Sequence, residues 1–123
     1  MKVFFVEDSP IVLERLEALL ATIEGADAVG HASRAEEAIH AILEAHPDAV
    51  VVDLKLAEGS GFDVLRAVHE RAPEIDLYML SNFAGEPYRR LAARLGARAF
   101  FDKSTEFERV RDTLAARASS TTH

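Results

Sequence analysis

The sequence is 123 residues long, enough for a single domain that buries its own core and folds alone. It contains no cysteine, which excludes disulfides, thiolate metal sites and thiol nucleophiles. The formal net charge of −7 argues against binding of the whole chain to nucleic acid or to anionic lipid. The charge is uneven, because residues 1–76 carry 16 acidic and 6 basic residues whereas 77–123 carry 5 and 8. The first part is suited to hold a cation, and the second an anion or an acidic partner.

Short apolar runs alternate with amphipathic helical patterns along the chain. The expected strands are 2–6, 28–32, 49–52, 76–80 and 98–101. Apolar residues recur at helical spacing in five segments, over 12–23, 35–43, 62–68, 88–95 and 107–114. The run 49–52 is apolar on both faces, which is typical of a central strand in a parallel sheet. This alternation predicts an α/β fold with a doubly wound, five-stranded parallel sheet and right-handed crossovers.

Several helix ends also have recognisable signals. Ser9 and Pro10 suit the N-cap and the first position of the first helix, and Gly25 is expected to stop it. Ser33 and Glu36 predict a capping box for the second helix. No apolar run approaches the roughly 18 residues of a membrane span, and there is no signal-peptide pattern. We therefore expect a cytoplasmic protein without membrane contact.

Polar residues follow four of the five expected strands, where the carboxyl ends of a parallel sheet open onto a ligand crevice. They are Glu7 and Asp8, then Asp53, then Ser81 and Asn82, and finally Lys103. Crowded carboxylates resist ionisation unless a cation is present, and Mg²⁺ prefers carboxylate, water and phosphate oxygens. A lysine and a hydroxyl suit an anion instead. A cation site and an anion site beside one aspartate predict phosphoryl transfer to Asp53, by positioning and charge neutralisation without a general base.

The same positions, with the stretches 53–65 and 95–104, resemble the receiver domain of two-component response regulators, the CheY-like superfamily. The resemblance covers residues 1–118, and 119–123 are predicted to form a polar tail. It implies the strand order 2-1-3-4-5. It also implies that Asp53 accepts phosphate from a histidine kinase, a phosphotransfer protein or a small phosphodonor. Enzymatic activity would at most be self-phosphorylation and autodephosphorylation at Asp53.

The resemblance also implies a role for each site residue. Those expected to hold Mg²⁺, with Mn²⁺ as an alternative, are Asp8, Asp53, the backbone carbonyl of Lys55 and, through water, Glu7. Those expected to hold the phosphoryl oxygens are Lys103, Ser81 and the backbone N–H of Asn82. Phe100 lies at the position of the family's switch aromatic, which would follow Ser81 when that residue moves toward the phosphate.

Partner binding is expected on the face formed by the fourth helix, fifth strand and fifth helix, where the family contacts its partners. A group of arginines lies there, either as a solvated face or as part of that contact: Arg89, Arg90, Arg94 and Arg98. We expect no direct nucleic-acid contact by this chain, and a monomer or a phosphorylation-dependent dimer.

The sequence departs from the family pattern at a few positions. Ser104 follows the lysine where proline is commonest, so the isomer of the Lys103–Ser104 bond stays open, and Ala57 also replaces a frequent proline. Lys55, Asn82 and Phe83 surround the acceptor with charge and bulk. We hypothesise that this alters the lifetime of the aspartyl phosphate.

Other interpretations compete with these assignments. Ser81 could be a helix cap, Lys103 a purely structural ion-pair partner of Asp53 or Asp102, and Phe100 a packing residue. The chain could be the N-terminal receiver part of a longer DNA-binding regulator, or a pseudo-receiver that binds without being phosphorylated. A haloacid-dehalogenase-type hydrolase would want a second aspartate where Lys55 stands.

Overall fold

The computed structural model describes residues 1–120 and consists of five strands and five helices in strict alternation. In chain order the elements are β1 (Lys2–Val6), α1 (Pro10–Leu20), β2 (Asp27–Ala32), α2 (Ala35–Ala45), β3 (Ala49–Val52), α3 (Gly61–Arg71), β4 (Asp76–Ser81), α4 (Glu86–Arg94), β5 (Ala97–Asp102) and α5 (Phe107–Ser120). All the strand pairs are parallel and the sheet order is β2-β1-β3-β4-β5. The predicted fold class and strand order are confirmed.

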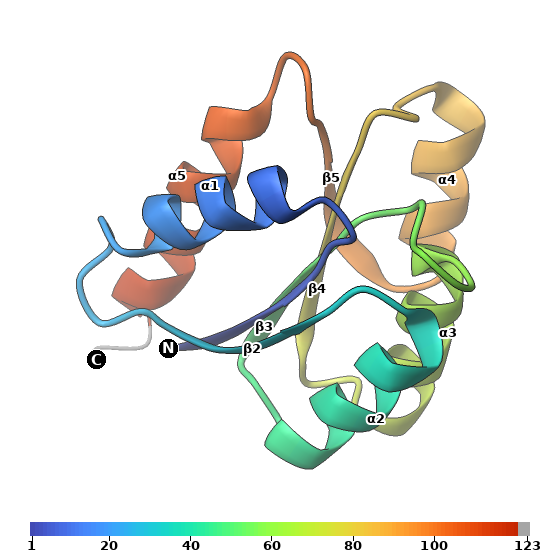
Figure 1. Ribbon diagram of the computed structural model, residues 1–123, viewed down its shortest axis with the longest axis horizontal. Helices are drawn as coiled ribbons and strands as arrows, with labels where there is room; N and C mark the ends of the chain where they lie inside the picture. Colours follow the sequence, from blue (N-terminus) through green and yellow to red (C-terminus); the bar gives the residue numbers. More distant parts are fainter. Residues whose placement is uncertain (121–123) are drawn as a thin grey trace.

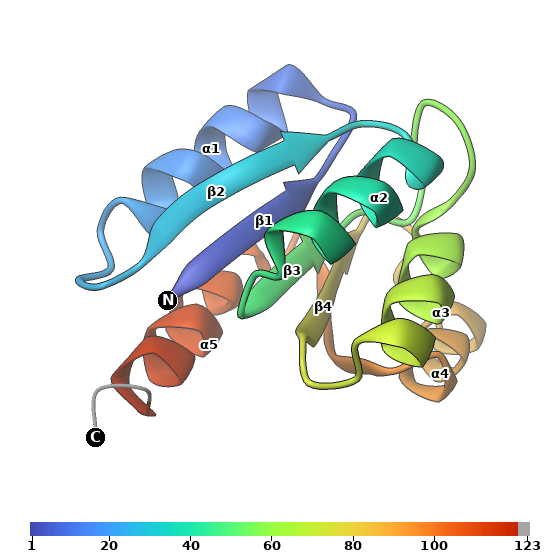
Figure 2. The same cartoon turned by 90° about the horizontal axis from the view of Figure 1, so that it is seen from below.

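Helices cover both faces of the sheet, with α1 and α5 on one side and α2, α3 and α4 on the other (Figures 1 and 2). Successive side chains of a strand point to opposite faces. Accordingly, Val50 and Val52 pack under α2, α3 and α4, whereas Val51 packs under α1 and α5. All four residues of β3 are buried, as the continuous apolar run predicted. The sheet thus holds the carboxyl end of β3 at the centre of its edge.

Helix α1 begins as predicted but ends earlier. The Ser9 hydroxyl accepts a hydrogen bond from the Val12 N–H at 3.3 Å, and Pro10 is the first helical residue. The helix stops at Leu20, although the apolar spacing continues to Ile23. The Thr22 hydroxyl donates to the Leu19 carbonyl at 2.7 Å, which satisfies one of the helix's terminal acceptors. Ile23 is still buried, but it reaches the core from a turn.

The capping box predicted for α2 is wrong. The N-cap is Arg34, and its side chain makes no capping hydrogen bond. Instead, the loop after β3 supplies the missing acceptor, because the Ala35 N–H donates to the Glu58 carbonyl at 2.9 Å. The Ala57 N–H donates to the Ser33 carbonyl at 2.9 Å, so the same loop also engages Ser33 through its backbone. A contact between distant segments thus replaces the local cap.

Helix α5 is the longest, with 14 residues, and extends through Ser120. It therefore includes the first two residues of the predicted polar tail, while 121–123 lie outside the described residues. Among residues 1–120, no helix combines the length and apolar character needed to cross a membrane.

A charged cluster fixes α5 to the amino-terminal edge of the sheet. Asp76, at the start of β4, is only 6% exposed. It pairs with Arg98 on β5 and with Arg117 on α5, and the second contact is a hydrogen bond from Nε. One buried carboxylate is thus neutralised by two guanidinium groups, as a stable buried charge requires. We call Asp76, Arg98 and Arg117 the amino-edge cluster.

Candidate functional site

The sheet brings the predicted site residues to one edge. Parallel backbone bonding continues beyond the strand ends: the Asp53 N–H donates to the Val6 carbonyl at 2.8 Å, and the Lys103 N–H donates to the Ser81 carbonyl at 3.0 Å. The residues after β1, β3 and β5 are therefore held in fixed register. This places Glu7, Asp8, Asp53 and Lys103 around one point, and we call these four residues the crevice cluster.

Lys103 lies between two buried carboxylates. Its Nζ is 2.8 Å from Asp53 Oδ2 and 2.8 Å from Glu7 Oε1. Burial alone would lower the pKa of Lys103, but the hydrogen bonds to Asp53 and Glu7 outweigh burial and raise it. The lysine is therefore held as a cation beside the acceptor candidate. The alternative pairing with Asp102 is not the one adopted.

The acids outnumber that lysine. Carboxylate oxygens of Glu7, Asp8 and Asp53 lie within 4.8 Å of one another. Burial raises the pKa of Glu7, as does the charge of Asp53, although the hydrogen bond from Lys103 and that from the Ser9 N–H at 3.0 Å act in the opposite direction. Three carboxylates facing one ammonium leave a negative excess that a hard divalent cation would relieve. The donor set is all oxygen, so it fits Mg²⁺.

A cavity of about 230 Å³ opens onto this cluster. Residues of the crevice cluster and of three loops line it: Asp8, Ser9, Val12, Asp53, Lys55, Ser81, Asn82, Phe83 and Lys103. The cavity therefore brings together most of the predicted site residues, both those expected to hold Mg²⁺ and those expected to hold the phosphoryl oxygens. Ser9 and Val12 were not predicted as lining residues, because their helix-start pattern signals only a cap.

Ser81 faces this cavity but is fully buried. Its hydroxyl oxygen accepts a hydrogen bond from the Phe83 N–H at 3.0 Å. The following helix begins at Glu86 with Gly85 as its N-cap, so Ser81 does not cap α4. The helix-cap interpretation of Ser81 is therefore wrong.

Gly61 closes the loop that carries Lys55 against the backbone of Leu54 and Asp53. The Gly61 N–H donates to the Leu54 carbonyl at 2.7 Å. A Cβ atom at position 61 would lie 2.2 Å from the Asp53 carbonyl oxygen, so only glycine fits. In the sequence, Gly61 stands out only as part of the stretch 53–65 that resembles the family. The close approach explains the residue physically.

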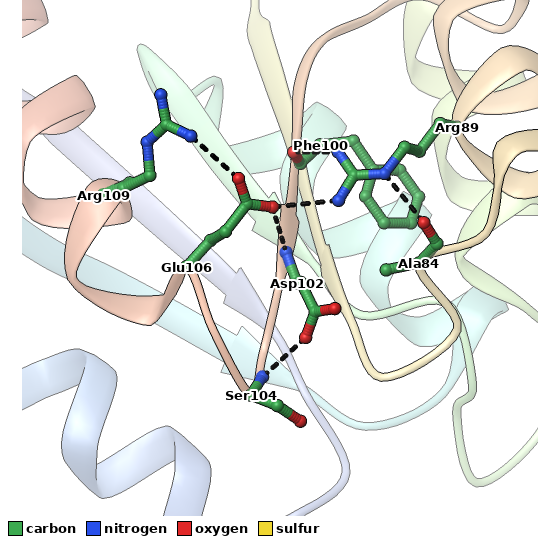
Figure 3. A network of polar contacts seen from close by, with 7 residues as sticks. All are labelled: Ala84, Arg89, Phe100, Asp102, Ser104, Glu106 and Arg109. Carbon is green, nitrogen blue, oxygen red and sulfur yellow. Dashed lines mark hydrogen bonds and ion pairs between the residues drawn. The ribbon is translucent and has the colours of Figure 1, made fainter.

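Phe100 is not among the residues that line the cavity. It lies on β5, half-buried, with the guanidinium carbon of Arg89 5.0 Å from its ring centroid (Figure 3). Arg89 also donates to backbone carbonyls and to Glu106, so the interpretation of this arginine as part of a solvated face is wrong. Arg90 and Arg94 are exposed. The Lys103–Ser104 bond, whose isomer the sequence left open, is trans.

Comparison with known proteins agrees with this geometry. The family model described as "Response regulator receiver domain" matches residues 3–115, and the chain belongs to this family. Receiver domains generally bind Mg²⁺ at an acidic pocket, and the group of Glu7, Asp8 and Asp53 is an acidic cluster of that kind. The predicted family membership is confirmed.

The relatives are longer regulators. The uncharacterized transcriptional regulatory protein YvfU of Bacillus subtilis is 29% identical over 114 residues, covering 93% of this chain and 57% of that protein. The DNA-binding transcriptional activator DevR/DosR of Mycobacterium tuberculosis is 30% identical over 103 residues, covering 84% and 48%. The chain spans about half the length of the curated relatives it matches.

Solved structures share the fold. A two-component response regulator of the LuxR family from Aurantimonas sp. SI85-9A1 superposes with a TM-score of 0.88 at 25% identity, covering 97% of this chain and 85% of that one. The response regulator domain of Thermotoga maritima CheB gives a TM-score of 0.85 at 23% identity, covering 98% and 94%.

Proposed function

We propose that Asp53 is the phosphoacceptor of this receiver domain. The observation that carries the proposal is the position of Asp53. Its carboxylate contacts the Lys103 ammonium at 2.8 Å, lies within 4.8 Å of carboxylate oxygens of Glu7 and Asp8, and lines an open cavity. The donor is a phosphohistidine of a histidine kinase or phosphotransfer protein, or a small phosphodonor. A new P–O bond forms to a carboxylate oxygen of Asp53 as the donor's P–N or P–O bond breaks. The electrons of the broken bond stay with the leaving group. When the donor is a phosphohistidine whose other ring nitrogen carries a proton, the histidine leaves as neutral imidazole.

Three groups bind and orient the transferred phosphoryl group in this proposal. Lys103 is already within contact distance of the Asp53 carboxylate, so its ammonium can move to a phosphoryl oxygen over a short path. The Ser81 hydroxyl and the Asn82 N–H donate to the remaining oxygens, and both residues line the cavity. For Ser81, this donation is compatible with its contact to the Phe83 N–H, because a hydroxyl donates and accepts.

Asp8, Asp53 and the Lys55 carbonyl would hold Mg²⁺ or Mn²⁺, with Glu7 acting through water. When bound, the ion neutralises the charge that develops on the phosphoryl oxygens. Besides Asp53, Lys103 contacts Glu7 at 2.8 Å. This contact occupies a Glu7 oxygen, which supports its assignment to binding the ion through water. The acidic pair and the lysine together argue against a pseudo-receiver.

Phosphorylation would change partner binding through the α4-β5-α5 face. Ser81 would move toward the phosphate, and Phe100 would follow it. Phosphate can shift the equilibrium between the two conformations only by the difference in its interaction free energy with them. The downstream partner is a protein, this chain makes no direct nucleic-acid contact, and the domain is a monomer or a phosphorylation-dependent dimer in the cytoplasm, where histidine kinases present their phosphohistidine.

One observation favours a second candidate, in which residues 1–118 are the receiver part of a longer DNA-binding regulator. Relatives named as transcriptional regulators are about twice as long as the segment matched here. In that case the same switch would act on an attached DNA-binding domain rather than on a separate protein. The phosphoacceptor chemistry at Asp53 is common to both.

Incubation with Mg²⁺ and acetyl phosphate, followed by intact mass measurement, tests the proposal. We expect one phosphoryl adduct in the wild type, none in Asp53→Ala, and an unchanged adduct in Asp112→Ala, which removes an exposed carboxylate. Absence of any adduct in the wild type would support the pseudo-receiver. Sustained turnover of a phosphomonoester would support the hydrolase.

A further inference from the structure

One arginine joins three segments on the α4 side of the cavity. Arg89 Nε donates to the Ala84 carbonyl at 2.7 Å, in the loop between β4 and α4. Its Nη1 donates to the Phe100 carbonyl on β5 at 3.1 Å, and its Nη2 pairs with Glu106 Oε1 at 2.9 Å (Figure 3). All three nitrogens of the planar guanidinium thus donate a hydrogen bond, an arrangement that lysine cannot reproduce.

The same guanidinium covers the aromatic ring of Phe100. Its central carbon is 5.0 Å from the ring centroid, within the range of a cation–π contact. The Arg89 side chain is 34% exposed, so this contact is only partly screened by solvent. Phe100 is therefore held twice by one residue, through its carbonyl and through its ring.

Glu106 anchors the other end of this contact to the turn that carries Lys103. Its Oε1 also accepts from the Asp102 N–H at 3.0 Å, and its own N–H donates to the Asp102 carbonyl at 2.8 Å. Its Oε2 accepts from Arg109 at 2.8 Å. We call the contact between Arg89 and Glu106 the Arg89–Glu106 bridge. It connects the loop after Ser81 with the turn around Lys103.

Phe100 and Ser81 lie on the same face of the sheet. Phe100 pairs with Met79 and Asp102 with Ser81, so Ser81 is two residues further along the neighbouring strand. Successive side chains alternate in direction, which puts the side chains of Phe100, Met79 and Ser81 on the α4 side. A movement of the Phe100 ring toward Ser81 would withdraw it from beneath the Arg89 guanidinium. The present ring position and the bridge stabilise each other.

We propose that the Arg89–Glu106 bridge opposes the switching movement of Phe100 and thereby sets how strongly the domain responds to phosphate at Asp53. This inference rests on the proposed function. Linkage makes the effect reciprocal: if the bridge disfavours the conformation that binds phosphate best, then removing it tightens phosphate binding. Arg89 and Glu106 are positioning residues here, since neither lines the cavity that Asp53 shares with Lys103.

The test measures beryllofluoride, a phosphate mimic, binding to the full chain with saturating Mg²⁺. The dissociation constant is obtained by titration calorimetry for the wild type, Arg89→Ala, Arg89→Lys and Glu106→Gln. We expect all three variants to bind at least about fivefold more tightly, at the lower end of ordinary coupling between sites. Arg89→Lys keeps the charge but loses the fork, so it should behave like the alanine variant.

Two matched variants control for charge and for loss of a surface contact. Arg90→Ala removes the neighbouring arginine, which makes an exposed pair with Glu86 at 3.7 Å. Arg109→Ala removes a second partner of Glu106 that is 70% exposed. Both are expected to bind beryllofluoride with the wild-type affinity. Denaturant unfolding of every variant identifies any that fails to fold, and the isosteric Glu106→Gln then replaces Arg89→Ala as the deciding variant.

A spectroscopic measurement separates switching from simple support. In protein labelled at phenylalanine, the Phe100 ring resonance without beryllofluoride should move in the bridge variants toward its position in the saturated wild type. If the wild type binds beryllofluoride and the variants bind it equally or more weakly, with the Phe100 resonance unmoved, the inference is overturned while the proposed function stands. If the wild type itself does not bind beryllofluoride, the proposed function fails and the inference fails with it.

Discussion

The carboxylates at the two edges of the sheet have opposite charge surroundings. At the carboxyl edge, the crevice cluster sets three acids against one lysine. At the amino edge, the single acid Asp76 is held by two arginines. Glu106 repeats the second pattern, with Arg89 and Arg109 as its partners. An acid with surplus cations is a structural anchor, whereas acids with too few cations are available for chemistry. The ratio of charges, more than burial itself, distinguishes the two.

This comparison predicts opposite stability effects for two isosteric changes. Asp76→Asn leaves two arginines without their anion and should lower the free energy of unfolding by about 3 kcal/mol. Asp53→Asn relieves repulsion among the acids and leaves Lys103 with Glu7, so the loss should stay below about 1 kcal/mol or become a gain. Urea unfolding at pH 7 in metal-free buffer measures both. Equal losses at the two positions would contradict the comparison.

Mg²⁺ should stabilise the folded protein by binding at the crevice cluster. At ten times its dissociation constant the ion should add about 1.4 kcal/mol to the free energy of unfolding, because it binds the folded state alone. Asp8→Asn, which removes one oxygen donor, should reduce this gain, and Asp76→Asn should retain it despite its lower starting stability. Urea titrations with and without the ion give the difference. A gain that Asp76→Asn abolishes would place the ion elsewhere.

The rim of the cavity should set the lifetime of the aspartyl phosphate. Lys55 and Phe83 both line the cavity beside Asp53, where charge and bulk affect the approach of water. We expect Lys55→Asn and Phe83→Ala to change the rate of phosphate loss severalfold. The decay of the mass adduct after removal of acetyl phosphate measures this rate. Rates equal to the wild type in both variants would end the hypothesis.

The contacts of Glu106 should change how the free energy of unfolding depends on pH in acid. Hydrogen bonds from Arg89 and from the Asp102 N–H lower its pKa to about 2, from 4.5. A carboxylate with a lowered folded-state pKa stabilises the protein above pH 4.5, and the contribution is lost as the pH falls from 4.5 to about 2. Glu106→Gln should therefore lose less stability than the wild type across that window in denaturant titrations. The exposed variant Glu108→Gln serves as the control, and parallel curves for all three proteins would refute the assignment.

Most of the fold followed from periodicity, because each strand and helix presents its own apolar pattern. The run 49–52 predicted a central strand, and all of its residues are buried. The location of the site also followed, since polar residues after parallel strands must meet at one edge. The strand order needed the family resemblance, because alternation alone permits several orders.

The errors at the start of α2 and at Arg89 share one physical cause, which is contact between segments that local sequence does not encode. Ser33 and Glu36 have the spacing of a capping box, but in the structure the Glu58 carbonyl accepts from the Ala35 N–H at the start of α2. Arg89 and Arg90 are adjacent in the sequence and chemically identical, yet one spans three segments and the other is exposed. Which of two arginines turns inward depends on where a distant carbonyl and carboxylate lie. Only the folded structure shows that.

The contacts also differ in how far along the chain they reach. Arg89 finds Phe100 and Glu106 only 11 and 17 residues away, whereas the Lys103 contact with Asp53 spans 50 residues. Contacts between distant residues require the intervening chain to be ordered, which costs conformational entropy before the contact repays it. A chain still emerging during synthesis has Asp53 long before it has Lys103. The complete pocket therefore arises only with the last strand, which ties its chemistry to the completion of folding.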